Sequence, residues 1–241
     1  MIHVSNLKKE FNGFTAVNGV SFEARPGEIF GLLGPNGAGK TTTLRMITTI
    51  LKPTDGEITV NGCSVLREPQ RVRTKLGVLA ETTGLYDRLT AEENVRYFAR
   101  LRDMPEQAIK SRIAEIFPVL GIDEYARKRA GTLSKGMKQK VSLAIAMIHD
   151  PPVLIFDEPT AGLDVMSARQ VREFVERYRR TEKTVIFSTH LMPEAEKLCN
   201  RIAIINQGKV AAIGTFEELK RQSGETALEE IFVKLVEEAK A

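Results

Sequence analysis

Several residue types are scarce in this sequence, and their scarcity excludes whole classes of protein. The 241 residues include no tryptophan, two cysteines and three histidines. Cys63 and Cys199 form no CxxC motif and belong to no histidine cluster, so the sequence offers no zinc motif and we expect two free thiols. No internal repeat or low-complexity segment is present.

Long apolar runs and a strong charge of one sign are missing as well. No stretch approaches the roughly 18 apolar residues that cross a bilayer, and residues 1–10 lack the apolar core of a signal peptide. We therefore expect a cytosolic chain that would serve a membrane process only through a partner. The net charge is +4. The densest basic stretch, residues 126–129, favours a solvated turn, and we expect no nucleic-acid partner.

The remaining composition is that of an ordinary globular protein, with 42% hydrophobic and 27% charged residues. The length suits one large domain, or one core with insertions, and it is long enough to bury a sizeable core.

The most informative stretch is residues 34–42, Gly-Pro-Asn-Gly-Ala-Gly-Lys-Thr-Thr. It matches the phosphate-binding loop pattern of Gly, four residues, Gly, Lys, then Ser or Thr. Glycines let the backbone curl tightly, and successive N–H groups of such a loop form a concavity that binds anions. Lys40 can reach the outer phosphates of a nucleotide, and Thr41 can place its hydroxyl on Mg²⁺.

The flanks of this loop fit the same role. The apolar run 28–33 predicts a strand, and apolar residues at helical spacing predict a helix over 41–51. A strand, a Gly-rich loop and a helix in this order place the phosphates at the positive end of the helix dipole. The alternative is a turn that only caps a helix, and the complete motif with both flanks argues against it.

Strand patterns on both sides of the middle region predict a sheet-based fold. Residues 1–24 and 57–61 contain stretches that alternate apolar and polar, which predicts a small antiparallel layer. Continuous apolar runs at 152–156, 184–188 and 202–205 are separated by helical patterns. Such runs are typical of a parallel sheet that is covered on both faces.

The middle and the end of the chain predict helices. Residues 87–148 open with a capping box at Thr90 and end in a helix that is apolar on nearly all sides, so that last helix should be buried. Gly121 is expected to end the helix that follows Pro105. Residues 227–239 predict an amphipathic helix that docks on its own domain, with contact to a partner as the less favoured alternative.

Two carboxylates stand at the carboxyl end of an apolar strand. Residues 153–156 are apolar, and Asp157 and Glu158 follow them directly. Ligands of open α/β sheets bind at this edge. Asp157 suits Mg²⁺, which takes few protein carboxylates, and Glu158 could orient or deprotonate a water that attacks a γ-phosphate. Solvated acids at a strand end are the alternative, which the phosphate loop upstream disfavours.

Taken together, these motifs resemble the ATPase subunit of ABC transporters over essentially the whole chain. Residues 133–137 are similar to the Leu-Ser-Gly-Gly-Gln signature of that family, and residues 161–164 to its D-loop. His190 follows a buried strand as the family's switch histidine does. Phe11 stands where the family has the aromatic residue that stacks on adenine.

The resemblance implies an α/β fold of the P-loop NTPase class: a RecA-like parallel sheet core with an antiparallel β subdomain and a helical subdomain. It implies a single domain over residues 1–241. Within it, about 1–86 and 149–215 would form the ATP-binding core with the β subdomain, about 87–148 the helical signature subdomain, and about 216–241 a C-terminal helical tail.

The resemblance also implies a composite site for ATP and Mg²⁺. Glu158 and His190 would be catalytic, and Thr41, Glu81 and Asp157 would serve the metal. Two ATP molecules would lie between two chains in a head-to-tail dimer, a homodimer or a heterodimer of cassettes. The residues implied to bind ATP within one chain are Phe11, Val17, Gly34, Pro35, Asn36, Gly37, Ala38, Gly39, Lys40, Thr41 and Thr42. Those implied to act on the partner's ATP are Ser134, Lys135, Gly136 and Met137, with Asp164 in the D-loop.

Three residues depart from the family pattern. Glu81 takes the place of the Q-loop glutamine and would add negative charge near the phosphates. Lys135 and Met137 replace the glycine and glutamine of the signature. Lys135 would add a positive charge facing the γ-phosphate. We expect the signature to keep its function because Ser134 and Gly136 remain.

The implied function is a motor at the cytoplasmic face of the membrane, in which ATP closes the dimer, hydrolysis opens it, and separate transmembrane permease subunits receive the motion. Residues 84–90 and the signature resemble exporter-type cassettes, including sodium-export (NatA-type) ATPases, and related cassettes serve drugs, lipids and polysaccharides. A soluble ABC-type ATPase acting on nucleic acid or ribosomes is the alternative; this chain has no second cassette, coiled-coil arm or zinc motif. A regulatory module without turnover is disfavoured by Glu158 and His190.

Overall fold

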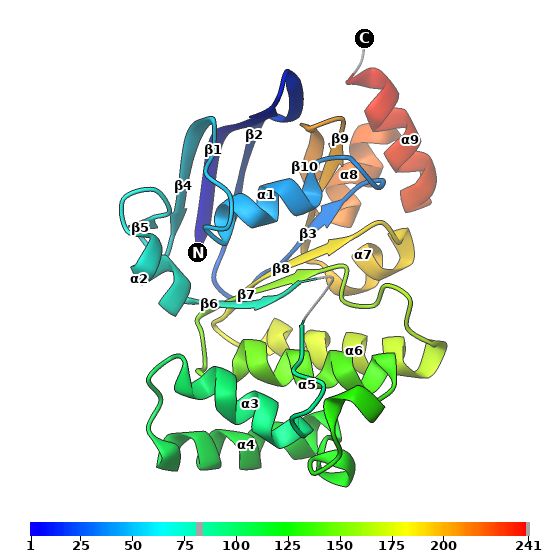
Figure 1. The fold of residues 1–241 in the computed structure, drawn as a ribbon. Coiled ribbons are helices and arrows are strands. Elements are labelled where there is room, and N and C mark those ends of the chain that lie inside the picture. The colour runs from blue at the N-terminus through cyan, green and yellow to red at the C-terminus, as the bar shows by residue number, and fades with distance from the viewer. Residues whose placement is uncertain (81–83, 240–241) are drawn as a thin grey trace.

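The computed structural model describes residues 1–80 and 84–239, and two sheets form their scaffold (Figure 1). The antiparallel sheet has the strand order β2-β1-β4-β5. Its strands are β1 (Ile2–Phe11), β2 (Phe14–Ala24), β4 (Asp55–Val60) and β5 (Cys63–Ser64). The second sheet has the order β10-β9-β3-β8-β7-β6 and is parallel except for β10. Its strands are β3 (Ile29–Leu33), β6 (Leu76–Leu79), β7 (Val153–Asp157), β8 (Thr184–Thr189), β9 (Arg201–Asn206) and β10 (Lys209–Gly214).

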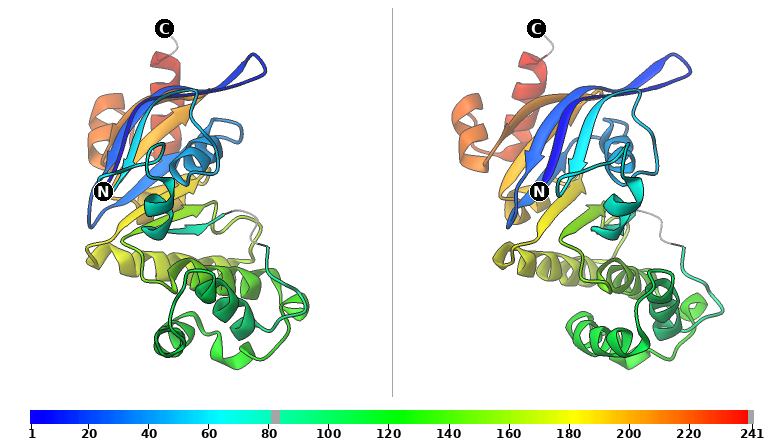
Figure 2. Two further views of the ribbon diagram at one scale, coloured as in Figure 1. Left: turned by 60° about the vertical axis from the view of Figure 1, so that its left-hand side comes forward. Right: turned by 90° about the vertical axis from the view of Figure 1, so that its left-hand side faces the viewer.

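Helices lie on both faces of the parallel sheet and form a separate layer below it (Figures 1 and 2). This arrangement confirms the predicted P-loop NTPase fold class. The helices are α1 (Lys40–Ile47), α2 (Pro69–Thr74), α3 (Ala91–Arg100), α4 (Glu106–Leu120), α5 (Lys135–Met147), α6 (Val165–Arg177), α7 (Met192–Leu198), α8 (Phe216–Ser223) and α9 (Leu228–Glu238).

The parallel sheet separates two hydrophobic cores. Every residue of β3, β7 and β8 is buried, which explains why their apolar residues follow one another without polar residues in alternation. Successive side chains of a strand point to opposite faces. Leu33 and Phe156 accordingly pack with the helical layer, whereas Leu32 and Ile155 pack with α1 and the antiparallel sheet.

Local signals in the sequence fix the ends of the helices in the lower layer. Thr90 and Glu93 form the predicted capping box of α3, each side chain bonded to the backbone of the other. Gly121 ends α4 in the left-handed conformation, as expected. Ser134 caps α5 by accepting a hydrogen bond of 3.2 Å from the Met137 N–H.

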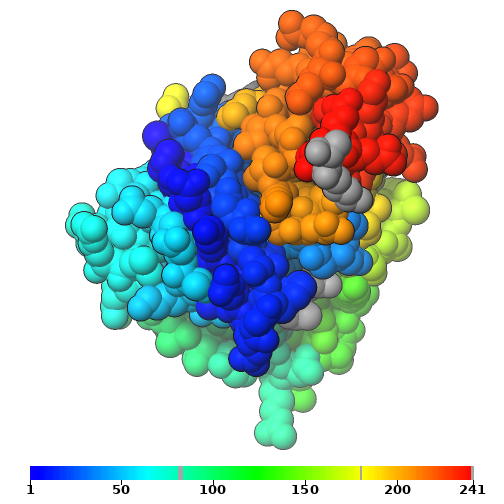
Figure 3. Space-filling model, turned by 90° about the horizontal axis from the view of Figure 1, so that it is seen from above, coloured from blue at the N-terminus to red at the C-terminus, as the bar shows by residue number. Residues whose placement is uncertain are grey.

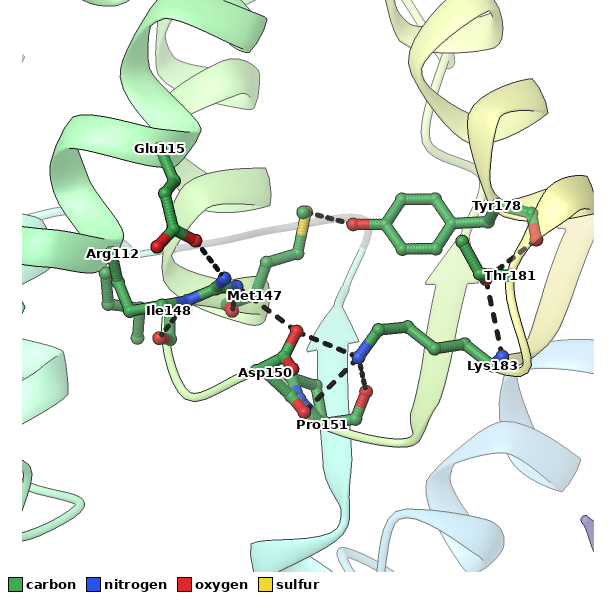
Figure 4. Close-up of polar contacts among 9 residues, drawn as sticks. All are labelled: Arg112, Glu115, Met147, Ile148, Asp150, Pro151, Tyr178, Thr181 and Lys183. Carbon is green, nitrogen blue, oxygen red and sulfur yellow. Dashed lines mark hydrogen bonds and ion pairs between the residues drawn. The ribbon is translucent and has the colours of Figure 1, made fainter. Parts of the chain in front are cut away.

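A polar network joins this helical layer to the sheet (Figure 4). Arg112 of α4 donates to the backbone oxygens of Met147 and Ile148 at the end of α5, at 3.2 and 3.3 Å. It also pairs with Asp150 at 3.3 Å. Lys183, directly before β8, reaches the same carboxylate at 3.0 Å. Asp150 therefore receives one cation from the helical layer and one from the sheet.

We expect Arg112→Ala to lower the free energy of unfolding by about 1–3 kcal/mol, because the carbonyls at the end of α5 lose a charged donor. Arg112→Lys should recover only part of this loss, because a lysine restores the positive charge but cannot donate several hydrogen bonds in the planar fork of an arginine. Urea unfolding would measure both variants. Arg169→Ala is the control, because Arg169 forms an exposed pair with Glu173, and such pairs contribute about 0–1 kcal/mol. Equal losses for Arg112→Ala and Arg169→Ala would contradict the proposed strength of the network.

The hairpin of β9 and β10 lies beside β2 of the antiparallel sheet, and the view from above shows this C-terminal part of the chain in orange next to the blue strands (Figure 3). The Asn18 N–H donates to the Gly208 oxygen at 2.7 Å, which ties β2 to the turn between β9 and β10.

Helix α9 buries Leu228, Ile231 and Leu235, so the expectation that it docks on its own domain is confirmed. None of the described helices is long and apolar enough to cross a membrane.

Some details differ from the sequence-based expectations. Helix α1 ends at Ile47 and not at Leu51, because Thr49 takes a left-handed conformation with φ +63° and turns the chain. Helix α2 and strand β6 were not predicted. The helical tail expected over about 216–241 is divided into α8 and α9. Both cysteines are free, as expected, and both are buried. Burial raises the pKa of Cys199 to about 12, which keeps this thiol unreactive.

Candidate functional site

A glycine-rich loop connects β3 to α1 and shapes the centre of the site. Gly39 has φ +104° and stands directly before the helix. A Cβ on Gly39 would lie 2.7 Å from the Ala16 oxygen, so only glycine fits there. The first N–H groups of α1 have no partner within the helix and can bind an anion.

Lys40 begins α1, and its side chain is almost fully buried. Its ammonium donates to the carbonyl oxygens of Gly34 at 2.7 Å and of Pro35 at 3.2 Å. It also forms an ion pair with Oε1 of Glu158 at 3.3 Å, and the side chains of the pair are 5% and 9% exposed. The loop thus holds its lysine in a fixed position beside an acid from the segment that follows β7.

Glu158 follows β7 and connects Lys40 to His190. Its Oε2 accepts a hydrogen bond of 2.8 Å from Nδ1 of His190, because an ionised carboxylate only accepts. The backbone of Glu158 is left-handed, with φ +49°, a conformation that costs energy and is typically found at functional sites. A hydrogen bond from its N–H to the Ser188 oxygen, at 3.1 Å, fixes this turn against β8.

These three residues stand at one edge of a cavity of about 550 Å³ that is lined by the phosphate loop, the β1–β2 hairpin and the segment after β7. Its lining residues are Phe11, Phe14, Ala16, Pro35, Asn36, Gly37, Ala38, Gly39, Lys40, Thr41, Thr42, Glu158, Ala161 and His190. The structure therefore brings together residues that the sequence separates by up to 179 positions (Phe11 to His190).

The cavity also holds an aromatic residue that was not predicted. Phe14 pairs with Phe11 across the tip of the hairpin, and the two are 67% and 41% exposed. The sequence signal for this pairing is the turn at residues 12–13, because a two-residue hairpin turn places Phe11 opposite Phe14. Val17, implied to bind ATP, is fully buried and does not line the cavity, whereas its neighbour Ala16 does.

Two of the three residues implied to serve the metal lie within the described structure, and the third does not. Thr41 and Asp157 line a small cavity of about 70 Å³ next to the main one, and Asp157 is 5% exposed. Glu81 lies outside the described residues. Among the described residues, no three His, Cys, Asp or Glu side chains gather as a metal cluster.

The signature residues lie outside this cavity and against their own D-loop. Ser134 and Lys135 are exposed at the start of α5. A Cβ on Gly136 would lie 2.3 Å from Oγ of Ser167, so a larger residue would separate α5 from α6. Asp164 caps α6 and accepts a hydrogen bond of 2.6 Å from Ser167 Oγ, which lowers the pKa of its carboxyl. Within one chain, the signature and the phosphate loop do not meet.

Comparison with known proteins identifies the family. Residues 17–161 match the family model described as ABC transporter. The chain is 45% identical over 219 residues to the ABC transporter ATP-binding protein NatA of Bacillus subtilis, covering 90% of this chain and 89% of that protein. It is 40% identical over 230 residues to the linearmycin resistance ATP-binding protein LnrL of the same organism, covering 95% and 74%.

Solved structures agree with the sequence matches. One, described as the structure of an ATP-binding subunit of an ABC transporter, has a TM-score of 0.90 at 31% identity and covers 98% of this chain and 99% of its own. Another, a dimeric ATP-binding cassette in a post-hydrolysis state with ADP and Pi, has a TM-score of 0.80 at 26% identity and covers 89% and 98%. The chain belongs to the ABC transporter ATP-binding proteins, and it is an ATPase of that family.

Proposed function

We propose that this chain is the ATP-hydrolysing subunit of an exporter whose permease is a separate chain. The observation that carries the proposal is the series Lys40–Glu158–His190 on the wall of the nucleotide-sized cavity, in which Lys40 and Glu158 are buried and His190 is partly exposed. A binding module without turnover needs the phosphate loop alone. A carboxylate held between a phosphate-binding lysine and a histidine supplies the groups that hydrolysis requires in addition.

Each residue has a distinct part in the proposed reaction. Lys40 and the N–H groups of the phosphate loop bind the terminal phosphates and offset their charge. Glu158 accepts a proton from the attacking water. His190 holds Glu158 through Nδ1, which leaves Nε2 to bind a phosphate oxygen or the water. Phe11 and Phe14 offer flat surfaces for the base.

The donors next to this site fit Mg²⁺. The metal prefers oxygen ligands, takes one or two carboxylates and keeps several waters. Thr41 and Asp157 present a hydroxyl and a carboxylate to one small cavity, and these two residues would hold the ion. When bound, Mg²⁺ would offset negative charge on the phosphates.

We further propose that two chains form the working unit. The signature residues of one chain lie away from its own cavity, so they can contribute to a nucleotide only if another chain brings its cavity to them. The solved cassettes that resemble this chain include dimers. Ser134 and Lys135 are exposed and stand at the start of α5, where free N–H groups favour an anion.

The cargo is proposed to be a sodium ion or a drug-like compound. The support comes from the relatives: NatA, the linearmycin resistance protein LnrL and a probable multidrug cassette of Escherichia coli at 36% identity. The exposed Tyr86 and Leu101 flank α3 in the helical layer, and we propose this surface as part of the contact with the permease.

Purification of the tagged chain from gently solubilised membranes of its native host tests the proposal. We expect a membrane protein with several spanning helices to co-purify, and the purified pair to hydrolyse ATP faster than the chain alone. Paired substitution of Tyr86 and Leu101 by Ser should weaken recovery of the permease without lowering basal phosphate release. If ribosomes or nucleic acid were recovered instead, in a salt-sensitive manner, the transporter assignment would give way to the soluble-ATPase alternative.

A further inference from the structure

We infer that Glu194 is a positioning residue that holds the Glu158–His190 pair in place. The inference rests on the proposed function, because it assigns Glu194 a role only if Glu158 and His190 act on ATP. Glu194 belongs to α7, does not line the nucleotide cavity, and was not singled out by any motif in the sequence.

The Glu194 carboxylate is buried between three elements and accepts three hydrogen bonds. Its Oε2 accepts from the hydroxyls of Thr160 at 2.8 Å and of Thr189 at 3.2 Å. Its Oε1 accepts from Arg172 of α6 at 2.9 Å. Glu194 is 5% exposed, and Thr160 and Thr189 are 6% and 1% exposed. One oxygen thus joins two hydroxyls, neither of which belongs to the helix that carries Glu194.

The two threonines flank the proposed catalytic residues in sequence. Thr189 directly precedes His190, and its Oγ1 also accepts a hydrogen bond of 3.0 Å from the Leu191 N–H. The Thr189 hydroxyl therefore fixes the backbone on both sides of His190. Thr160 follows Glu158 by two residues, within a turn that the Ala161 N–H closes on the Glu158 oxygen at 3.1 Å.

The strained backbone of Glu158 explains what the hydrogen bonds of Glu194 would do. A non-glycine residue with φ +49° keeps that conformation only where the surroundings impose it. The strand side of the turn is held by the bond from the Glu158 N–H to the Ser188 oxygen. The far side is held by Thr160 on Glu194. Because Thr189 is held by the same oxygen, Glu194 fixes the distance between the turn of Glu158 and the strand end of His190.

Isosteric substitutions separate this role from simple packing. Thr160→Val and Thr189→Val keep the volume and remove the hydroxyl, whereas Thr160→Ser and Thr189→Ser keep the hydroxyl. We expect each valine variant to lower kcat about tenfold or more, since small displacements of catalytic groups are costly. The Kd for ATP should change less than about twofold, because the phosphate loop is not touched, and the serine variants should recover most of the activity.

Glu194→Gln tests the shared acceptor itself. Its amide has one oxygen and one NH₂ group, so it can accept from the threonines or from Arg172 but not satisfy all three. We expect kcat to fall with Kd unchanged, and the loss in the Glu194→Gln, Thr160→Val double variant to be smaller than the product of the single losses. Glu196→Gln is the matched control, because Glu196 lies exposed on the same helix.

The outcomes decide between the alternatives. If the valine variants and Glu194→Gln keep kcat within twofold of the unmodified chain, the inference is wrong. It is equally wrong if kcat, ATP affinity and melting temperature fall together and serine does not restore them, because the residues would then serve only stability. Glu158→Gln, assayed in parallel, reports on the proposed function: retained turnover there would overturn the catalytic assignment itself.

Discussion

Glu158→Gln is expected to stop ATP turnover while ATP still binds. Glutamine has nearly the same shape and can still accept the hydrogen bond from His190, but it cannot take a proton from water. General-base catalysis contributes roughly 10²–10⁴-fold, so phosphate release should fall by at least about 10²-fold. Lys40 would also lose its ionic partner, which favours ATP as the replacement. We therefore expect ATP affinity to be unchanged or higher.

The same variant should accumulate as a dimer when ATP is present. Hydrolysis is the step that opens the proposed dimer, and an inactive chain would stop before it. Size-exclusion chromatography with ATP, with ADP and without nucleotide measures this, alongside phosphate release. Glu176→Gln, an exposed position on α6, serves as the control. Turnover within a few-fold of the unmodified chain would remove Glu158 from the mechanism.

Lys40→Ala is expected to weaken ATP binding itself. Its ammonium is already positioned by the carbonyls of Gly34 and Pro35, so nucleotide binding does not have to order it. Hydrogen bonds to charged groups contribute about 1.5–3 kcal/mol, which corresponds to a Kd for ATP that is roughly 10–100-fold higher. Calorimetric titration of the purified chain measures the change.

Removal of Lys40 also destabilises the chain in the absence of ATP, and a second variant separates this effect from the loss of ATP binding. Without Lys40, the Glu158 carboxylate stays buried beside His190 and loses a positive partner, which is costly. The Lys40→Ala, Glu158→Gln double variant removes that cost. We expect it to fold more stably than Lys40→Ala and still bind ATP weakly. Affinity equal to that of Glu158→Gln alone would count against the phosphate-loop assignment.

Much of the fold could be predicted because its signals are local. Thr90 and Glu93 cap one helix, Gly121 ends another, and the buried strands β7 and β8 contain the uninterrupted apolar runs 153–156 and 185–187. The predicted end of α1 was wrong because the helix stops at a left-handed turn formed by Thr49, and the sequence has no glycine there to indicate such a turn. The helical tail was expected from about residue 216, but the capping box of Thr215 and Glu218, which begins a separate helix α8, was not singled out.

The site could be predicted as a set of residues but not as a geometry. The phosphate loop, the Asp157–Glu158 pair and His190 each belong to a short motif. Their contacts depend on strands far apart in the chain, so spacing could not indicate that Glu158 pairs with Lys40. Glu194 was beyond sequence reasoning for the same reason: its partners come from the segment after β7, from β8 and from α6.

Under the proposed mechanism, the pairing of Lys40 with Glu158 would make ATP binding an exchange of counter-ions. The two opposite charges lie 3.3 Å apart and neutralise each other inside the protein. A phosphate that binds Lys40 would replace Glu158 as its counter-ion and would leave the carboxylate able to accept a proton from a water. When phosphate leaves, the original pair would re-form. The proposed base would therefore be available only while the group on which it acts is bound.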